Sequence, residues 1–260
     1  MKRVLLVARR EWLEHRRQPA MILSMAAVLA MISGLVLFVA LLMALIDSQP
    51  HSKALFEQNL ATAGFELQDP IPTVTEGVLS SFNFLLFTQF LGMTAVLAGH
   101  AVVHERQCGT LPFLMVAPVR RWELVLGKVL GAVGTPWLLY LVLGGGTATI
   151  LALLDVTAPF AWRLPPASGW LVAFLLGGPA WSLALASAGA ALSVRAADVR
   201  TAQQGVWLVV FLASIMVGTI LGGALQEDTV FQLVVAAGGL LFTALGVGAA
   251  TLLLRRDIHL

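Results

Sequence analysis

Six long apolar stretches constrain this chain more than any other feature of its sequence. They lie near residues 20–46, 78–103, 126–154, 169–194, 205–225 and 230–254. Each reaches the length of about 20 predominantly apolar residues that a helix needs to cross a bilayer. Lys128 is the one charged residue well inside them, and we expect its ammonium group to snorkel from a helix end to the interface. The pattern predicts an all-α integral membrane protein with six transmembrane helices.

The composition supports the same fold class. Hydrophobic residues make up 58% of the 260 residues and charged residues only 12%, whereas soluble domains carry roughly 25% charged residues. A soluble protein of this size would still have to cover its surface with polar groups, so we expect lipid to cover much of this one. The single cysteine, Cys108, excludes an intramolecular disulfide framework. We predict one transmembrane domain over residues 1–260.

The distribution of basic residues predicts the orientation. If the N-terminus is cytoplasmic, 14 of the 16 Lys and Arg residues fall on the inner side, which agrees with the positive-inside rule. Those residues are Lys2, Arg3, Arg9, Arg10, Arg16, Arg17, Arg106, Arg120, Arg121, Lys128, Arg195, Arg200, Arg255 and Arg256. Six spans also return the C-terminus to the cytoplasm, so we expect both termini to be cytoplasmic.

The first 19 residues are basic and contain an apolar stripe. Leu5, Ala8 and Trp12 follow at i, i+3 and i+7, which favours an amphipathic helix in the inner interface that ends before Pro19. The alternative is a solvated basic extension of the first span. The apolar run Val4–Ala8 is too short for a cleavable signal, so we expect the N-terminus to be retained.

The links between the apolar stretches differ in character. Residues 47–77 are polar and acidic and contain three prolines, and residues 155–168 are proline-rich and predicted to be a loop. Residues 195–204 form a short basic link, and residues 226–229 predict a tight hairpin between the last two spans. Gly127 and Gly131 are spaced to let a neighbouring helix approach closely.

Few side chains suggest chemistry within the chain. No G-x-x-x-x-G-K-[ST] motif occurs, so a nucleotide cannot be bound by that route. His100, His104 and Cys108 could form a metal site, but histidines at a membrane interface are ordinary and we predict no metal. Three polar residues of the second span, Asn83, Thr88 and Gln89, are candidates for lining a pathway, and interhelical hydrogen bonds are the alternative.

The informative segment is the cytoplasmic link at residues 104–128. Gly109 permits a sharp turn, and Thr110 can cap a short apolar helix in which Pro112 is tolerated in the first turn. Leu111, Phe113 and Leu114 make that helix apolar, and Pro118 would end it. A short apolar helix between charged residues predicts a docking element at the cytoplasmic surface. A membrane-surface loop without a partner is the alternative.

The cytoplasmic link resembles the corresponding segment of a known family. Residues 105–128 are similar to the E-x-x-x-G-T, P-V-x-R-x-E-L-x-x-G-K pattern of ABC-type-2 transporter permeases, which lies between the second and third spans of that family. The matching residues are Glu105, Gly109, Thr110, Leu114, Pro118, Val119, Arg121, Glu123, Leu124, Gly127 and Lys128. Pro112 departs from the pattern, because the family more often has an acidic or polar residue there.

The resemblance implies a membrane subunit of an exporter in a bacterial inner membrane. It would pair with a second permease, as a homodimer or a related heterodimer, and with two ATP-binding subunits that would hold ATP and Mg²⁺. This chain itself would not be an enzyme. The coupling helix would dock on the ATP-binding subunit through Glu105, Gly109, Thr110, Leu111, Phe113, Leu114, Pro118, Arg120, Arg121, Glu123 and Lys128. The pathway would lie between two permeases, lined mainly by the first, second and fifth spans.

Other readings of the sequence remain. A secondary transporter or channel would also have six spans, but it usually needs ionisable residues within the membrane. A membrane enzyme would need polar catalytic groups, and a structural anchor for a motility or cofactor-maturation machine is a further alternative. The apolar composition favours a lipid, amphipathic drug or peptide as the substrate, and no nucleic-acid partner is expected.

Overall fold

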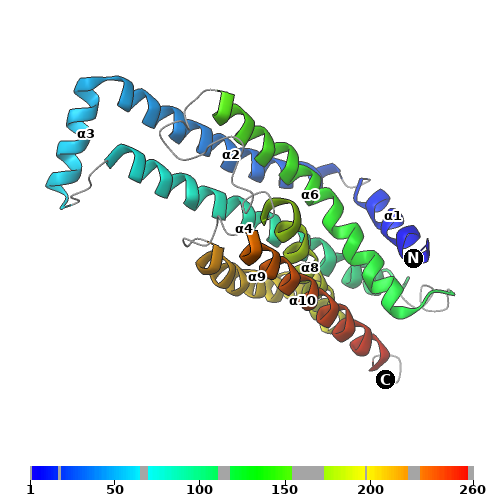
Figure 1. Cartoon of the computed structure of the whole chain (residues 1–260). Helices are drawn as coiled ribbons and strands as arrows, with labels where there is room; N and C mark the ends of the chain where they lie inside the picture. Colours follow the sequence, from blue (N-terminus) through cyan, green and yellow to red (C-terminus); the bar gives the residue numbers. More distant parts are fainter. Residues whose placement is uncertain are drawn as a thin grey trace.

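A computed structural model describes residues 2–16, 19–64, 70–110, 118–153, 173–196, 198–221 and 229–256, and these residues form a helical bundle (Figure 1). The described part contains no strand. In chain order its helices are α1 (Lys2–Arg16), α2 (Pro19–Ser48), α3 (Pro50–Thr62), α4 (Pro70–Gln107), α6 (Arg121–Leu153), the π-helical turn η1 (Ala173–Gly177), α8 (Gly178–Arg195), α9 (Val199–Leu221) and α10 (Thr229–Arg256).

The helices coincide with the predicted apolar stretches. Four segments of the described part are long and apolar enough to cross a membrane, namely Ile22–Ser48, Arg121–Thr147, Leu175–Arg195 and Leu233–Leu254. The helices α4 and α9 occupy the positions of the other two predicted spans. The prediction of an all-helical membrane protein is therefore confirmed, and the number of six spans stays a prediction.

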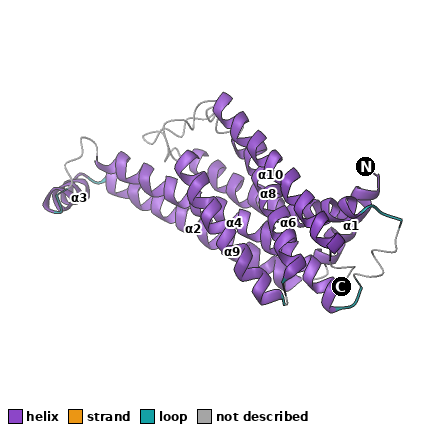
Figure 2. Ribbon diagram, turned by 90° about the horizontal axis from the view of Figure 1, so that it is seen from below, coloured by secondary structure: helices purple, strands orange, loops and turns teal. Residues whose placement is uncertain are grey.

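The polar link at residues 47–77 contains helical structure. Within it Pro50–Thr62 form α3, and α4 begins at Pro70. Pro50 occupies the first turn of α3, where its missing N–H costs nothing. Figures 1 and 2 place α3 at the end of the molecule opposite both termini. Polar residues are compatible with a helix here because α3 buries no side chain.

The short link between α8 and α9 is explained by a helix cap. The Asp198 Oδ1 atom accepts the Thr201 N–H at 2.7 Å, so Asp198 caps the first turn of α9. The same hydrogen bond holds the pKa of the Asp198 carboxyl below its ordinary value. The hairpin predicted at residues 226–229 falls partly outside the described residues, as does the loop predicted at 155–168.

α8 lies at the centre of the bundle and is rich in small residues. Ala184, Ser187 and Ala190 are buried in it. Gly189 of α8 lies directly against the Ala95 carbonyl of α4, and Gly239 of α10 lies against Ala180. A Cβ atom at either glycine would overlap these neighbours. Small residues thus bring the backbones of α4, α8 and α10 into close contact.

Candidate functional site: the junction of α1, α4 and α6

The end of α4 is shaped as the sequence predicts. Gly109 has φ +68°, a left-handed conformation that glycine adopts without strain. The Gly109 N–H donates to the Arg106 carbonyl at 3.1 Å, and the Thr110 N–H donates to the Glu105 carbonyl at 2.9 Å. These hydrogen bonds satisfy carbonyl groups that the last turn of a helix leaves unpaired. The sharp turn predicted at Gly109 is confirmed.

Thr110 takes part in the end of α4, because its hydroxyl donates to the Glu105 carbonyl at 3.2 Å. The capping role predicted for Thr110 concerns a helix that would begin among residues outside the described part, so it stays a prediction. The predicted docking residues Leu111, Phe113 and Leu114 lie outside the described residues.

The start of α6 is capped by a residue of the motif. The Arg120 N–H donates to the Glu123 Oε2 atom at 2.9 Å, which is the acidic half of a capping box. Just ahead of it, the Pro118 carbonyl accepts a hydrogen bond of 2.6 Å from the Arg3 guanidinium group of α1. Arg120 is exposed and Arg121 is half-buried. Both ends of segment 111–117 are thus anchored by hydrogen bonds.

A buried ion cluster joins the three helices. The Lys128 Nζ atom lies 2.7 Å from Glu11 Oε1 of α1 and 2.8 Å from Glu105 Oε2 of α4. The three side chains are only 2%, 5% and 6% exposed. Lys128 Nζ also donates to the Ala101 carbonyl at 3.4 Å, and the Arg10 guanidinium lies 3.8 Å from Glu105. The first and last residues of the motif, Glu105 and Lys128, are therefore ion-paired.

This cluster corrects the expectation for Lys128. We expected its ammonium group to snorkel toward the interface, but the group turns into the protein because two buried carboxylates neutralise it. A buried charge is stable only when it is paired. Burial raises the pKa of the Glu105 carboxyl above its ordinary value, and Lys128 opposes that rise.

Two glycines let α1 approach close enough for this pairing. A Cβ atom at Gly127 would lie 2.6 Å from Val7 Cβ, and one at Gly131 would lie 2.6 Å from Glu11 Cβ. The close approach predicted from the Gly127 and Gly131 spacing is confirmed, and α1 is the helix that uses it. Part of the predicted apolar stripe of α1 faces away from α6, since Leu5 is exposed.

Sequence reasoning missed the residues that complete the junction. Glu11 supplies a carboxylate from α1, and Arg106 donates to the carbonyls of Val194 and, at 3.2 Å, Ala196 at the end of α8. Arg106 therefore ties the motif to the central helix. The basic character of the segment was visible in the sequence, but no local pattern pairs residues separated by about 90 to 117 positions.

Comparison with known proteins identifies the family. Residues 5–237 match the family described as ABC-2 family transporter protein. The chain belongs to the ABC-2 transporter family. The multi-pass membrane character of this ABC-2 transporter protein follows from both its helices and its family. No curated protein is significantly similar to this ABC-2 transporter protein.

The structure does not bring the predicted pathway residues into this junction. Asn83, Thr88 and Gln89 lie on α4, in the part of the helix that leads away from it. The Thr88 hydroxyl is buried, and Gln89 is half-buried. The side chain of Asn83 lies outside the described residues. A pathway-lining role for these three residues of the ABC-2 transporter protein stays a prediction.

The two histidines near the end of α4 lie against each other and beside Cys108. The rings of His100 and His104 stack with centroids 5.3 Å apart, and Cys108 Sγ lies 3.7 Å from His104 Nε2. Among the described residues, no group of three or more His, Cys, Asp or Glu side chains could hold a metal ion.

Proposed function

We propose that this chain is the transmembrane permease subunit of an ATP-driven exporter. ATP hydrolysis by a separate ATP-binding subunit would drive the outward movement of a substrate through it. The observation that carries the proposal is the ion pair between Glu105 and Lys128, which lie on either side of residues 111–117 and join the end of α4 to the start of α6. The family membership supports pairing with an ATP-binding subunit.

The junction explains how a pull on segment 111–117 would reach the membrane helices. The segment follows the end of α4 and precedes the start of α6. The ion pair between Glu105 Oε2 and Lys128 Nζ, 2.8 Å apart, joins these two helices. Lys128 also pairs with Glu11, so α1 follows the same movement. The three helices would move as rigid elements between two states that differ in affinity for ATP.

The proposed complex contains two copies of this chain and two ATP-binding subunits. ATP and Mg²⁺ would be held by the ATP-binding subunits, since this sequence has no nucleotide-binding motif. The complex would lie in a bacterial inner membrane with both termini of the chain cytoplasmic. Its substrate class would be a lipid, an amphipathic drug or a peptide, in keeping with the apolar helices.

The test is a substitution in the anchored segment of the complete complex. Leu114→Glu should abolish the stimulation of ATP hydrolysis by the permease, because a charge would occupy the apolar docking position. The control is Leu55→Glu, which places the same charge on the exposed surface of α3 at the far end of the molecule. Complexes would be reconstituted in liposomes, and the ATPase rate and outward movement of a fluorescent phospholipid would be measured together.

The outcomes separate the proposal from its alternatives. Loss of coupling in Leu114→Glu with normal activity in Leu55→Glu supports the docking role. Transport by the chain without any ATP-binding subunit would instead indicate a secondary transporter or channel. Tight ATP binding by the purified chain alone would contradict the assignment of ATP binding to a separate subunit.

A further inference from the structure

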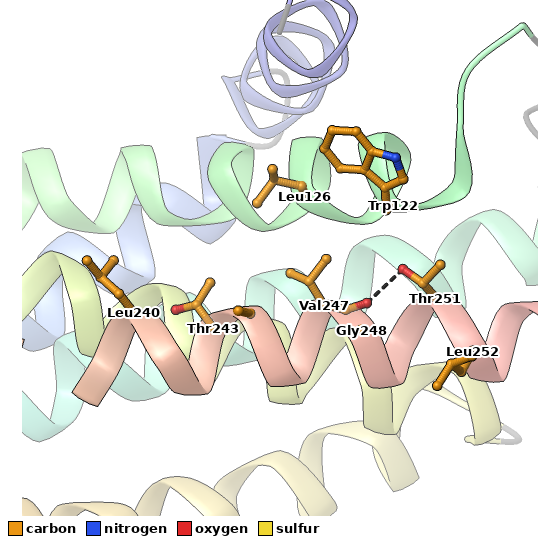
Figure 3. Close-up of a pocket in the computed structure, with 9 residues that line it drawn as sticks. Trp122, Leu126, Leu240, Thr243, Val247, Gly248, Thr251 and Leu252 are labelled. Atoms are coloured by element: carbon orange, nitrogen blue, oxygen red, sulfur yellow. Dashed lines mark hydrogen bonds between the residues drawn. The ribbon is translucent and has the colours of Figure 1, made fainter. Parts of the chain in front are cut away.

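A groove lies between the start of α6 and the second half of α10. It has a volume of about 610 Å³, and Trp122 and Leu126 of α6 face Leu240, Val247, Gly248 and Leu252 of α10 across it (Figure 3). Trp122, Leu240 and Leu252 are 41%, 56% and 60% exposed, so the groove opens to the outside of the bundle. The described part of the chain leaves this apolar surface uncovered.

The hydroxyl groups in the groove need no polar ligand. The Thr251 hydroxyl donates to the Val247 carbonyl at 2.7 Å, and the Thr243 hydroxyl donates to the Gly239 carbonyl at 2.9 Å. Neither threonine hydroxyl is therefore left without a hydrogen-bond acceptor. In lipid every polar group has to be satisfied within the protein, so the groove is suited to a hydrocarbon occupant.

The length of the groove matches one acyl chain. The residues Leu240–Leu252 of α10 span about 18 Å at about 1.5 Å per residue, which is close to the about 15 Å of hydrocarbon in one leaflet. Carbon atoms pack at about 4 Å, so a single extended chain fits against the side chains that line the groove.

The charges at one end of the groove select the headgroup. Trp122 and Leu252 mark that end, where α6 begins and α10 terminates (Figure 3). Arg120 and Arg121 immediately precede Trp122 in the chain, and both side chains are at least partly exposed. The carboxylate next to Trp122, that of Glu123, is engaged in capping α6. Basic residues beside a membrane surface attract anionic lipids by about 1 kcal/mol each.

We propose that the groove binds one acyl chain of an anionic phospholipid whose headgroup lies beside Arg120 and Arg121. Trp122 would lie at the level of the headgroups, where tryptophan is enriched in membrane proteins. The lipid is a resident ligand of the permease and not its cargo. The proposal rests on the membrane location of the chain and does not depend on coupling to ATP.

The test is a substitution that fills the groove with a side chain of the protein itself. A Cβ atom at Gly248 meets no atom within 4 Å, so Gly248→Leu extends into the groove without a clash inside the protein. Gly238→Leu is the matched control, since Gly238 lies on the same helix, has the same open surroundings and does not line the groove. Leucine is also favoured over glycine in a helix, so both variants should fold.

The measurement is native mass spectrometry of the full-length chain in detergent with added dioleoyl phosphatidylglycerol or dioleoyl phosphatidylcholine. We expect the wild type and Gly238→Leu to retain one phosphatidylglycerol in preference to phosphatidylcholine, and Gly248→Leu to retain about tenfold less, a factor equal to ~1.4 kcal/mol. Arg121→Gln should lower the preference about fivefold, which is the effect of ~1 kcal/mol from one basic residue.

Three results would overturn the proposal. Equal retention by the two leucine variants would show that the groove holds no lipid. Equal retention of the two lipids by the wild type would show that the groove does not select an anionic headgroup. A change from dimer to monomer in Gly248→Leu with unchanged lipid retention would assign the groove to a second copy of the chain. None of these results involves the ATP-binding subunit, so none of them tests the proposed exporter function.

Discussion

Replacing Lys128 by methionine tests the central role of the ion cluster. The substitution keeps the length and the apolar stem of the side chain but leaves Glu11 and Glu105 buried without the cation that lies 2.7 and 2.8 Å from them. Both carboxylate oxygens are near one nitrogen, so they lie within about 5.5 Å of each other and would repel. Removing one partner of a buried ion pair typically costs about 3–5 kcal/mol.

The pH dependence of unfolding gives a second measure of the stability lost in Lys128→Met. The variant can relieve the repulsion by protonating one carboxyl group, which at pH 7 costs about 3.7 kcal/mol for a glutamate with an ordinary pKa of about 4.3. At pH 5 the same protonation costs only about 1 kcal/mol. Removal of Lys128 leaves burial to raise the pKa of the Glu105 carboxyl unopposed by that cation, so the deficit relative to the wild type shrinks as the pH falls. The deficit should be smaller at pH 5 than at pH 7 by at most about 2.7 kcal/mol, the difference between the two protonation costs.

The assay is denaturant or thermal unfolding of the purified chain in detergent micelles at both pH values. A loss of about 3–5 kcal/mol corresponds to a decrease in Tm on the order of 10 °C. The double variant Lys128→Met with Glu11→Gln should recover part of the loss, because it leaves a single buried carboxylate. A loss below about 1 kcal/mol at pH 7, or one that is the same at pH 5, would refute a buried charged cluster.

Three further predictions concern the same end of the molecule. Gly131→Leu should displace α1 and destabilise the fold by about 1–3 kcal/mol, because its Cβ would overlap Glu11; Gly145→Leu, whose Cβ meets no atom within 4 Å, is the control for unfolding measurements. Arg106→Met should cost about 1–3 kcal/mol in the same assay by leaving two carbonyls of α8 without their donor, and an unchanged stability would argue against that tie. Cys108 is exposed and is the sole cysteine, so a membrane-impermeant maleimide should label it only after cells are permeabilised; labelling of intact cells would reverse the proposed orientation.

The sequence predicted the helices well because membrane insertion imposes a simple rule. A long apolar stretch must satisfy its backbone polar groups internally, and a helix does this without reference to the rest of the chain. Helix α3 at residues 50–62 was not predicted. This short helix is polar and buries nothing, so it lacks the apolar periodicity that identified the other helices.

The site was predictable only as far as its motif extends. The turn at Gly109 follows from glycine, and the position of Glu123 follows from capping chemistry. The pairing of Lys128 with Glu11 does not follow from either, since it joins residues 117 positions apart. The side-chain environment of Lys128 was wrongly predicted for the same reason. A charge near a helix end snorkels by default, and only the tertiary contact with α1 supplies a better partner.

The glycine contacts of α8 limit how this permease can change shape. Where two backbones touch at Gly189 and at Gly239, neither helix can slide or roll past the other without collision. Helices α4, α8 and α10 should therefore move as one rigid unit whenever the protein changes conformation. Displacements would then be left to the helices around this unit, α2 among them.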